Sequence, residues 1–172
     1  MKKIIALVVL ACLYTTANAA TYSFNVAAGS NVGSGSLVTD ATGFATSGSL
    51  VMTSGADMGT YVLFSGGVSP TYSPYNAFIF DNMTYNGSAI DLDWYGLLFV
   101  GNGLEINIWG NGAGNPYSFW SHNGSGYNFS SDAAAFAMTA ATPIPAAVWL
   151  FGSALVGLAG IGKRKQGKVL IA

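Results

Sequence analysis

Side chains that could carry out catalysis are scarce in this sequence. His122 is the only histidine and Cys12 the only cysteine, whereas a zinc or redox centre needs three or four such ligands. A Ser-His-Asp arrangement would have to be built around His122, which lies in a predicted hairpin turn at residues 122–126. A solvated turn histidine is the favoured interpretation. We therefore expect neither an enzyme nor a cofactor.

Two carboxylates, Asp91 and Asp93, are spaced so that both lie on the same side of a strand. Such carboxylates could ligate calcium or, with a further acid, form the pair that cleaves a glycosidic bond. The surrounding sequence lacks the glycine and the distal glutamate of an EF-hand loop. Calcium at Asp91 and Asp93 is therefore a minor alternative, and we expect no metal site.

Aromatic side chains offer another kind of chemistry, because their flat faces can stack on sugar rings. The candidates are Trp94, Tyr95, Trp109, Tyr117 and Trp120. Alternation along the predicted strands places Trp109 and Trp120 on one shared face. Core packing between two sheets is the favoured interpretation of that face. If the face is instead exposed, Trp94, Trp109 and Trp120 are the sugar-stacking candidates.

The elements that must position these side chains are strands. Apolar and polar residues alternate with a period of two, and sequences rich in glycine and asparagine at 101–103, 110–115 and 122–126 predict hairpin turns. The predicted strands are 21–27, 34–39, 44–53, 60–65, 76–84, 93–100, 104–109, 116–121, 126–131 and 133–140. About ten short antiparallel strands predict an all-β fold, a single β-sandwich or jelly-roll-like domain over residues 20–141.

Charged residues are few and unevenly distributed. They make up 8% of the chain, against about 25% in typical soluble domains. All seven acidic residues lie within residues 20–141, and all six basic residues lie outside them, at the two ends. An acidic segment without cations repels polyanions, so we expect no nucleic-acid partner.

Residues 1–19 have the three parts of a secretory signal peptide. A lysine pair precedes an apolar run over residues 4–14, and the small residues Ala17 and Ala19 occupy the −3 and −1 positions of a cut before Ala20. We predict a signal helix that is removed on export. The exported protein then contains no cysteine and depends on sheet packing for its stability.

The other end of the chain predicts a membrane helix. Residues 146–162 are uncharged, and as a helix they would be about 25 Å long, at the short end of what crosses a hydrocarbon core of about 30 Å. The basic cluster Lys163, Arg164 and Lys165 follows. Because basic residues favour the cytoplasmic side, we predict that residues 166–172 form a cytoplasmic end and that residues 20–141 are held outside.

A Pro-x-Pro motif, Pro143-Ile144-Pro145, precedes this helix and disfavours helical backbone there. With the helix and the basic cluster, residues 142–165 resemble the PEP-CTERM sorting signal of Gram-negative bacteria, in its VPLPA-type variant. In that family an exosortase, a membrane-embedded cysteine protease or transpeptidase, recognises the tail. Ile144 stands where the eponymous motif has glutamate, and residues 167–172 extend beyond the usual basic end.

The exported segment also resembles an all-β ectodomain common in that family, over residues 90–99, 105–112 and 117–119. The resemblance implies a precursor anchored in the inner membrane with a periplasmic domain, then a protein at the cell surface or outside the cell. Its expected role is structural or adhesive, in exopolysaccharide or biofilm. The alternative is a carbohydrate-binding module, which needs at least two coplanar exposed aromatic rings. A glycan-cleaving enzyme, which needs two carboxylates about 5 to 10 Å apart in a cleft, is less favoured.

Overall fold

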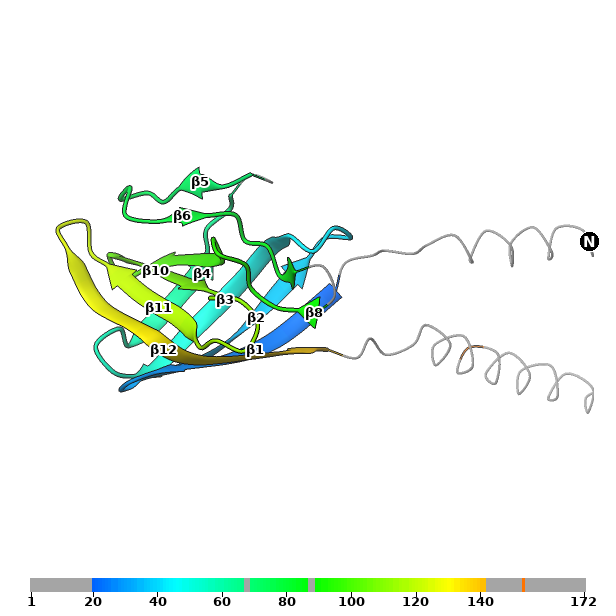
Figure 1. Ribbon diagram of the computed structural model, residues 1–172, viewed down its shortest axis with the longest axis horizontal. Helices are drawn as coiled ribbons and strands as arrows, with labels where there is room; N and C mark the ends of the chain where they lie inside the picture. Colours follow the sequence, from blue (N-terminus) through cyan, green and yellow to red (C-terminus); the bar gives the residue numbers. More distant parts are fainter. Residues whose placement is uncertain (1–19, 67–68, 87–88, 142–152, 154–172) are drawn as a thin grey trace, which may run out of the picture. The chain divides into compact units, whose positions relative to one another are not determined.

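The computed structural model describes residues 20–66, 69–86, 89–141 and Ser153. The predicted all-β class is confirmed, because the described residues of segment 20–141 contain strands and no helix (Figure 1). Eight antiparallel strands form a closed barrel in the order β1-β12-β11-β10-β9-β4-β3-β2. Their bounds are β1 Ala20–Ala28, β2 Asn31–Thr39, β3 Ala45–Ser54, β4 Gly59–Leu63, β9 Leu97–Gly101, β10 Leu104–Trp109, β11 Tyr117–His122 and β12 Tyr127–Ala140. Four two-residue strands lie outside the barrel: β5 Thr71–Tyr72, β6 Ile79–Phe80, β7 Tyr85–Asn86 and β8 Ala89–Ile90.

The closed barrel replaces the two-sheet sandwich or jelly roll that the sequence predicted. Closure is made by the first and last strands, which pair from Tyr22 with Ala140 to Ala27 with Ala135. Alternation shows which side of a strand faces the core, but it does not show which strands are neighbours. A sandwich and a barrel therefore have the same sequence pattern.

The last strand is also longer than predicted. The two expected strands, 126–131 and 133–140, form a single strand of 14 residues, β12. Its register against β11 shifts between Tyr117 and Phe119 and again between Ser121 and His122. Such bulges bend and twist a strand, which lets β12 follow the curved wall of the barrel from β11 to β1.

The main core fills the inside of the barrel. Its buried large side chains come from alternate positions of the strands and include Phe24, Leu37, Leu50, Met52, Tyr61, Phe99, Ile106, Ile108 and Phe119. Gly35 pairs with Phe24 on the neighbouring strand, and a Cβ at this glycine would overlap the phenyl ring. The absence of a side chain on β2 therefore makes room for the ring inside the barrel.

A hairpin formed by β5 and β6 lies over the outer face of the barrel (Figure 1). Phe78 and Phe80 pack against Leu98 there and form a second, smaller core. The sequence predicted one strand over residues 76–84, but only Ile79–Phe80 is a strand. Asn76 and Asn82 have φ values of 58° and 60°, which interrupt the extended backbone on both sides.

The buried carboxylate of Glu105 ties this hairpin to β10. The hydroxyl of Ser73 donates to Glu105 Oε1 at 2.8 Å, and the backbone N–H of Tyr75 donates to Oε2 at 3.1 Å. Nδ1 of His122 lies 4.0 Å from Oε1. These two bonds satisfy both oxygens of a buried carboxylate, so Glu105 fixes the hairpin over the start of β10.

The targeting segments predicted at the two ends of the chain lie largely outside the described residues. These are the signal peptide with Ala17 and Ala19, the Pro143-Ile144-Pro145 motif, the helix at 146–162, and the basic cluster Lys163, Arg164 and Lys165. Ala20 is the first residue of β1, and Ser153 is helical and exposed. Among the described residues, no helix has the length and apolar character needed to cross a membrane. By its contacts the chain divides into two units, Met1–Ala141 and Thr142–Ala172.

Candidate functional site

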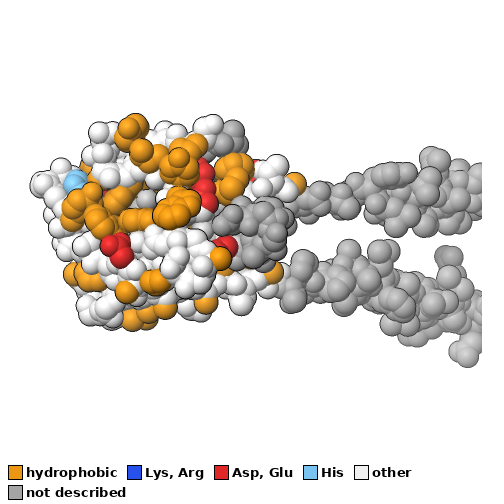
Figure 2. Space-filling view, in the orientation of Figure 1, with side chains coloured by type: hydrophobic (Ala, Val, Ile, Leu, Met, Phe, Trp, Pro, Cys, Tyr) orange, Lys and Arg blue, Asp and Glu red, His pale blue; other side chains and the backbone are white. Residues whose placement is uncertain are grey.

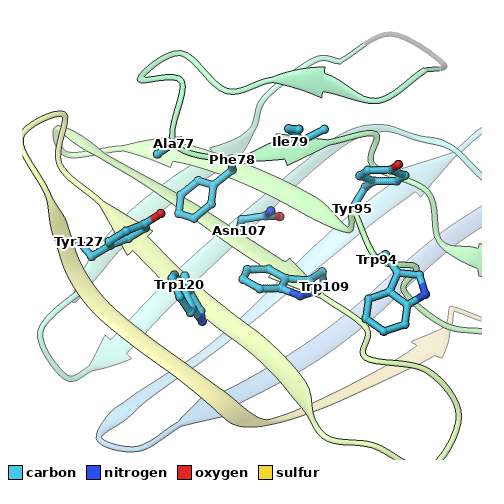
Figure 3. Close-up of a pocket in the computed structure, with 9 residues that line it drawn as sticks. All are labelled: Ala77, Phe78, Ile79, Trp94, Tyr95, Asn107, Trp109, Trp120 and Tyr127. Carbon is cyan, nitrogen blue, oxygen red and sulfur yellow. The ribbon is translucent and has the colours of Figure 1, made fainter.

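An aromatic groove lies on the outer face of the barrel, beside the β5–β6 hairpin. Figure 2 shows a band of hydrophobic side chains on this face, with acidic side chains next to it. The groove has a volume of about 360 Å³ (Figure 3). Its lining residues are Ala77, Phe78, Ile79, Trp94, Tyr95, Asn107, Trp109, Trp120 and Tyr127. All three predicted sugar-stacking residues therefore lie in one site, which we call the aromatic groove.

Strand register brings Trp109 and Trp120 together. Trp120 pairs with Asn107, so Trp109, two residues further along β10, is its diagonal neighbour on the outer face. The two ring centroids are 5.8 Å apart, and the ring planes are inclined by 52°. The shared face was predicted correctly, but the pair is tilted instead of coplanar. The condition of two coplanar exposed rings is therefore not met by this pair, and the rings line an angled groove instead of a flat platform.

No second sheet of the barrel covers these residues, but Trp120 packs against the second core of Phe78, Phe80 and Leu98, so the face is part core and part open groove. Trp94 is 70% exposed and Tyr127 is 56% exposed, while Trp109 and Trp120 are half-buried. The β5–β6 hairpin covers only the neighbouring part of the wall and supplies one side of the groove. The rings are thus held by the fold and open to solvent, as a binding site requires.

Trp120 is fixed by contacts on both its edge and its face. Its ring N–H donates to Asp132 Oδ1 at 2.9 Å, and the same oxygen accepts the Ser118 hydroxyl at 2.8 Å. Tyr127 packs against Trp120 edge-to-face, with centroids 5.0 Å apart and an angle of 89°. These contacts hold the indole in one orientation before any ligand arrives.

Trp94 and Tyr95 are positioned by a tight turn before β9. Asp93 Oδ1 accepts the backbone N–H of Tyr95 at 2.9 Å and that of Gly96 at 2.8 Å. Gly96 has a φ of 64°, and a Cβ at this position would overlap the carbonyl oxygen of Ile108. The turn therefore depends on a glycine that presses against β10, the strand that carries Trp109.

Asn107 provides an unpaired hydrogen-bond acceptor in the groove. The residue is 3% exposed, and its Oδ1 is the one buried side-chain nitrogen or oxygen without a partner in the described part of the chain. Figure 3 places its amide among the aromatic rings. Leaving a buried acceptor unpaired costs about 1–3 kcal/mol. This oxygen has almost no surface open to solvent, so a ligand can donate to it only if the Asn107 side chain turns toward the groove.

The chain matches no protein-family model, no curated protein and no solved structure. The resemblance of residues 142–165 to a PEP-CTERM tail stays a prediction from the sequence. The same holds for the likeness of the exported segment to an ectodomain of that family. The function of the aromatic groove must be argued from its own residues.

The sequence did not single out five of the lining residues: Ala77, Phe78, Ile79, Asn107 and Tyr127. A signal was present for Asn107, because it lies between the core residues Ile106 and Ile108 and thus on the same face as Trp109. No local pattern predicts that residues 77–79 return to lie against β10. Their place in the groove is set by tertiary contacts of the hairpin.

The structure separates the predicted carboxylate pair. Asp91 accepts the hydroxyl of Tyr117 at 2.5 Å and the backbone N–H of Leu92 at 2.8 Å. Burial, followed by the bond to Asp91, raises the pKa of Tyr117 to about 12. Asp93 instead lies beside Asp81. The described residues contain no group of three or more histidine, cysteine or acidic side chains that could hold a metal ion.

The pair of Asp81 and Asp93 makes stability depend on pH. Burial, with a contribution from Asp93, raises the pKa of Asp81 from 3.8 to about 6. The folded state therefore holds this proton more tightly than the unfolded chain does. The stabilisation is complete below about pH 4 and is lost as the pH rises through about 6.

We expect the free energy of unfolding to decrease by about 1–3 kcal/mol between pH 4 and pH 7 because of this group. Denaturant titrations across that range will measure the decrease. The Asp81→Asn variant, which keeps an oxygen for the backbone N–H of Met83, should lose this part of the pH dependence. Parallel pH profiles of the native chain and the variant would contradict the assignment.

His122 has a structural place in the described fold. Its Nδ1 accepts the backbone N–H of Gly124 at 3.0 Å, within the turn that the sequence predicted. Its ring packs against Phe78 and Tyr127, with centroids 6.4 and 5.3 Å away. Nδ1 is therefore already used in the turn, and the ring supports the wall of the aromatic groove.

Proposed function

We propose that this chain is an exported surface protein whose barrel binds polysaccharide through the aromatic groove. The observation that carries the proposal is the meeting of Trp94, Trp109 and Trp120 in one open groove, although they come from three separate segments. Aromatic faces bind the C–H faces of sugar rings, and polar groups between them fix the orientation of a ligand. Such binding suits an adhesive or structural role in an extracellular matrix.

The proposal favours binding over catalysis. A glycosidase needs two carboxylates about 5 to 10 Å apart on either side of the bond that is cleaved. The residues that line the aromatic groove include no acid, and Asp132 at its edge is occupied by Trp120 and Ser118. Neither Asp81 nor Asp93 lines the aromatic groove.

Truncation of the most exposed ring tests glycan binding. We expect Trp94→Ala to weaken binding of oligosaccharides to the purified full chain by about 30-fold, or about 2 kcal/mol. The reason is that tryptophans covered by a bound partner are typical hot spots of recognition. Trp94 is mostly exposed in the free protein, so its loss should leave the fold intact. Isothermal titration calorimetry with hexasaccharides of different composition measures the effect.

Tyr72→Ala is the matched control, because Tyr72 is 62% exposed but does not line the groove. Its affinity should equal that of the native chain. Two results would refute the proposal: a native chain that binds none of the oligosaccharides, or a Trp94→Ala variant that binds as tightly as the native chain.

The second part of the proposal concerns export. We propose that residues 1–19 direct secretion and that an exosortase-type membrane protease processes the tail at Pro143-Ile144-Pro145. The last barrel strand ends at Ala140, so only two residues separate the barrel from this motif. A proline-held, extended backbone next to a membrane helix suits recognition by a membrane protease.

Mass spectrometry of envelope and medium fractions tests the processing. The native protein should lose its C-terminal segment, whereas a variant with Pro143→Ala and Pro145→Ala should keep it. Pro116→Ala, which changes an exposed proline within the domain, should be processed normally. An intact tail on the native protein would favour a simple membrane anchor and exclude processing.

A further inference from the structure

The charge around the aromatic groove has one sign. The sequence from residue 20 to residue 141 contains seven acidic residues and no lysine or arginine. Acidic side chains border the hydrophobic band in Figure 2, and Asp132 is bonded to a ring of the groove itself. An acidic sugar would lose water there and find no side-chain cation in return, whereas a cationic sugar would be attracted.

The groove also presents an unusual number of π faces. Its five aromatic residues from outside the hairpin are Trp94, Tyr95, Trp109, Trp120 and Tyr127. The faces of such rings carry negative electrostatic potential, and tryptophan attracts cations most strongly. The N–H of Trp120 points to the carboxylate of Asp132, which increases the electron density of that indole. Several rings around one site thus favour a positively charged group.

The unpaired oxygen of Asn107 adds a directional requirement. It is an acceptor that needs a donor, and it lies among the rings. Because this oxygen is buried, a ligand reaches it only when the Asn107 side chain turns toward the groove. An ammonium group has three donors and no acceptor, so it then satisfies Asn107 without bringing an oxygen that needs a donor of its own. A hydrogen bond from a charged donor is also stronger than one from a neutral hydroxyl.

We propose that the aromatic groove selects amino-sugar polymers that carry free ammonium groups over neutral and acidic glycans. This inference rests on the proposed glycan binding and specifies its ligand class. Three separate observations favour a cationic ligand that donates hydrogen bonds. They are the π faces, the acidic surroundings without cations, and the unpaired acceptor. The ligand is then a chain of hexosamine units whose nitrogen atoms are not acetylated.

Three oligosaccharides that differ only at carbon 2 isolate the charge. We suggest β-1,4-linked hexamers of glucosamine, glucose and N-acetylglucosamine, with a galacturonic acid oligomer as the acidic probe. The full chain is titrated with each at about pH 5.5, where amines are protonated. We expect the glucosamine hexamer to bind about tenfold more tightly than the glucose hexamer, and this preference to shrink in about 0.5 M salt.

An isosteric variant tests whether the groove itself senses the charge. The amide oxygen in Asp132→Asn can still accept the bonds from Trp120 and Ser118, so the groove keeps its shape. We expect the loss of affinity for the glucosamine hexamer to be about threefold larger than any loss for the glucose hexamer. Asp40→Asn, which removes a half-buried acid that does not line the groove, should leave both affinities unchanged.

The outcomes separate this inference from the function on which it rests. Equal or tighter binding of the glucose, N-acetylglucosamine or galacturonic acid oligomer, with sensitivity to Trp94→Ala, overturns the charge preference and leaves glycan binding in place. The glucosamine hexamer could also bind equally well to the native chain, to Trp94→Ala and to Asp132→Asn. That result would mean a general attraction to an acidic protein, and it also overturns the inference. Failure of every oligomer to bind overturns both proposals.

Discussion

The Asp57→Ala variant should lose about 3–5 kcal/mol of its free energy of unfolding. Asp57 is fully buried, and its Oδ1 accepts the hydroxyl of Ser121 at 2.9 Å and the amide of Asn128 at 2.6 Å. Its Oδ2 accepts the amide of Asn31 at 3.1 Å. Alanine would leave the donors of Ser121 and Asn31 buried without an acceptor, whereas Asn128 is exposed and can bond to water. Each buried unpaired group lowers stability.

Urea unfolding followed by tryptophan fluorescence measures this loss as a lower midpoint at an unchanged slope. Asp40→Ala is the control, because Asp40 is also a carboxylate that accepts backbone hydrogen bonds, but in an exposed turn. Its midpoint should stay close to that of the native chain. If the two variants unfold at similar urea concentrations, the buried bonds of Asp57 contribute little to stability.

The Gly96→Ala variant should lose about 2–4 kcal/mol and should also bind glycans more weakly. Its φ of 64° is costly for alanine, and the new methyl group would overlap the carbonyl oxygen of Ile108 and lie 2.6 Å from the Cα of Trp109. Relief of that overlap moves the turn with Trp94 and Tyr95 away from β10. Denaturant titration and calorimetry with oligosaccharides measure the two effects.

Gly103→Ala separates backbone strain from steric overlap. Gly103 also has a positive φ, 73°, but a Cβ there meets no atom within 4 Å. Its loss should therefore be about 1 kcal/mol, from the backbone alone, with glycan affinity unchanged. Equal losses of stability in the two variants would show that the close approach of the turn to β10 is unimportant.

The barrel strands could be predicted well where their two faces differ. Ile106 and Ile108 face the core while Trp109 lies outside, as alternation requires. The turn between β9 and β10 was also readable, because Asn102 and Gly103 both adopt the positive φ that their sequence favours. These features depend on neighbouring residues alone, so the sequence contains them.

Features that depend on distant contacts could not be predicted. The pairing of β1 with β12 joins residues more than a hundred positions apart, and no local pattern specifies it. The predicted strands ended at residue 131 and began again at residue 133, yet β12 continues through Asp132. There Asp132 accepts bonds from Trp120 and Ser118 on the neighbouring strand. The groove shows the same division: alternation placed Trp109 and Trp120 on one outer face, but it did not show that the face is partly open or that residues 77–79 form one wall.

The side-by-side position of the first and last barrel strands has a mechanical consequence. Tyr22 pairs with Ala140, and the N–H of Ala141 donates to the carbonyl of Thr21 at 2.7 Å. Tension applied at the C-terminal end would run along β12, which is bonded to β1 on one side and to β11 on the other. Ladder bonds lie across the strands, so they would bear this load together in shear and would not peel apart one by one. A chain tethered by its tail could thus be pulled hard while the groove keeps its shape.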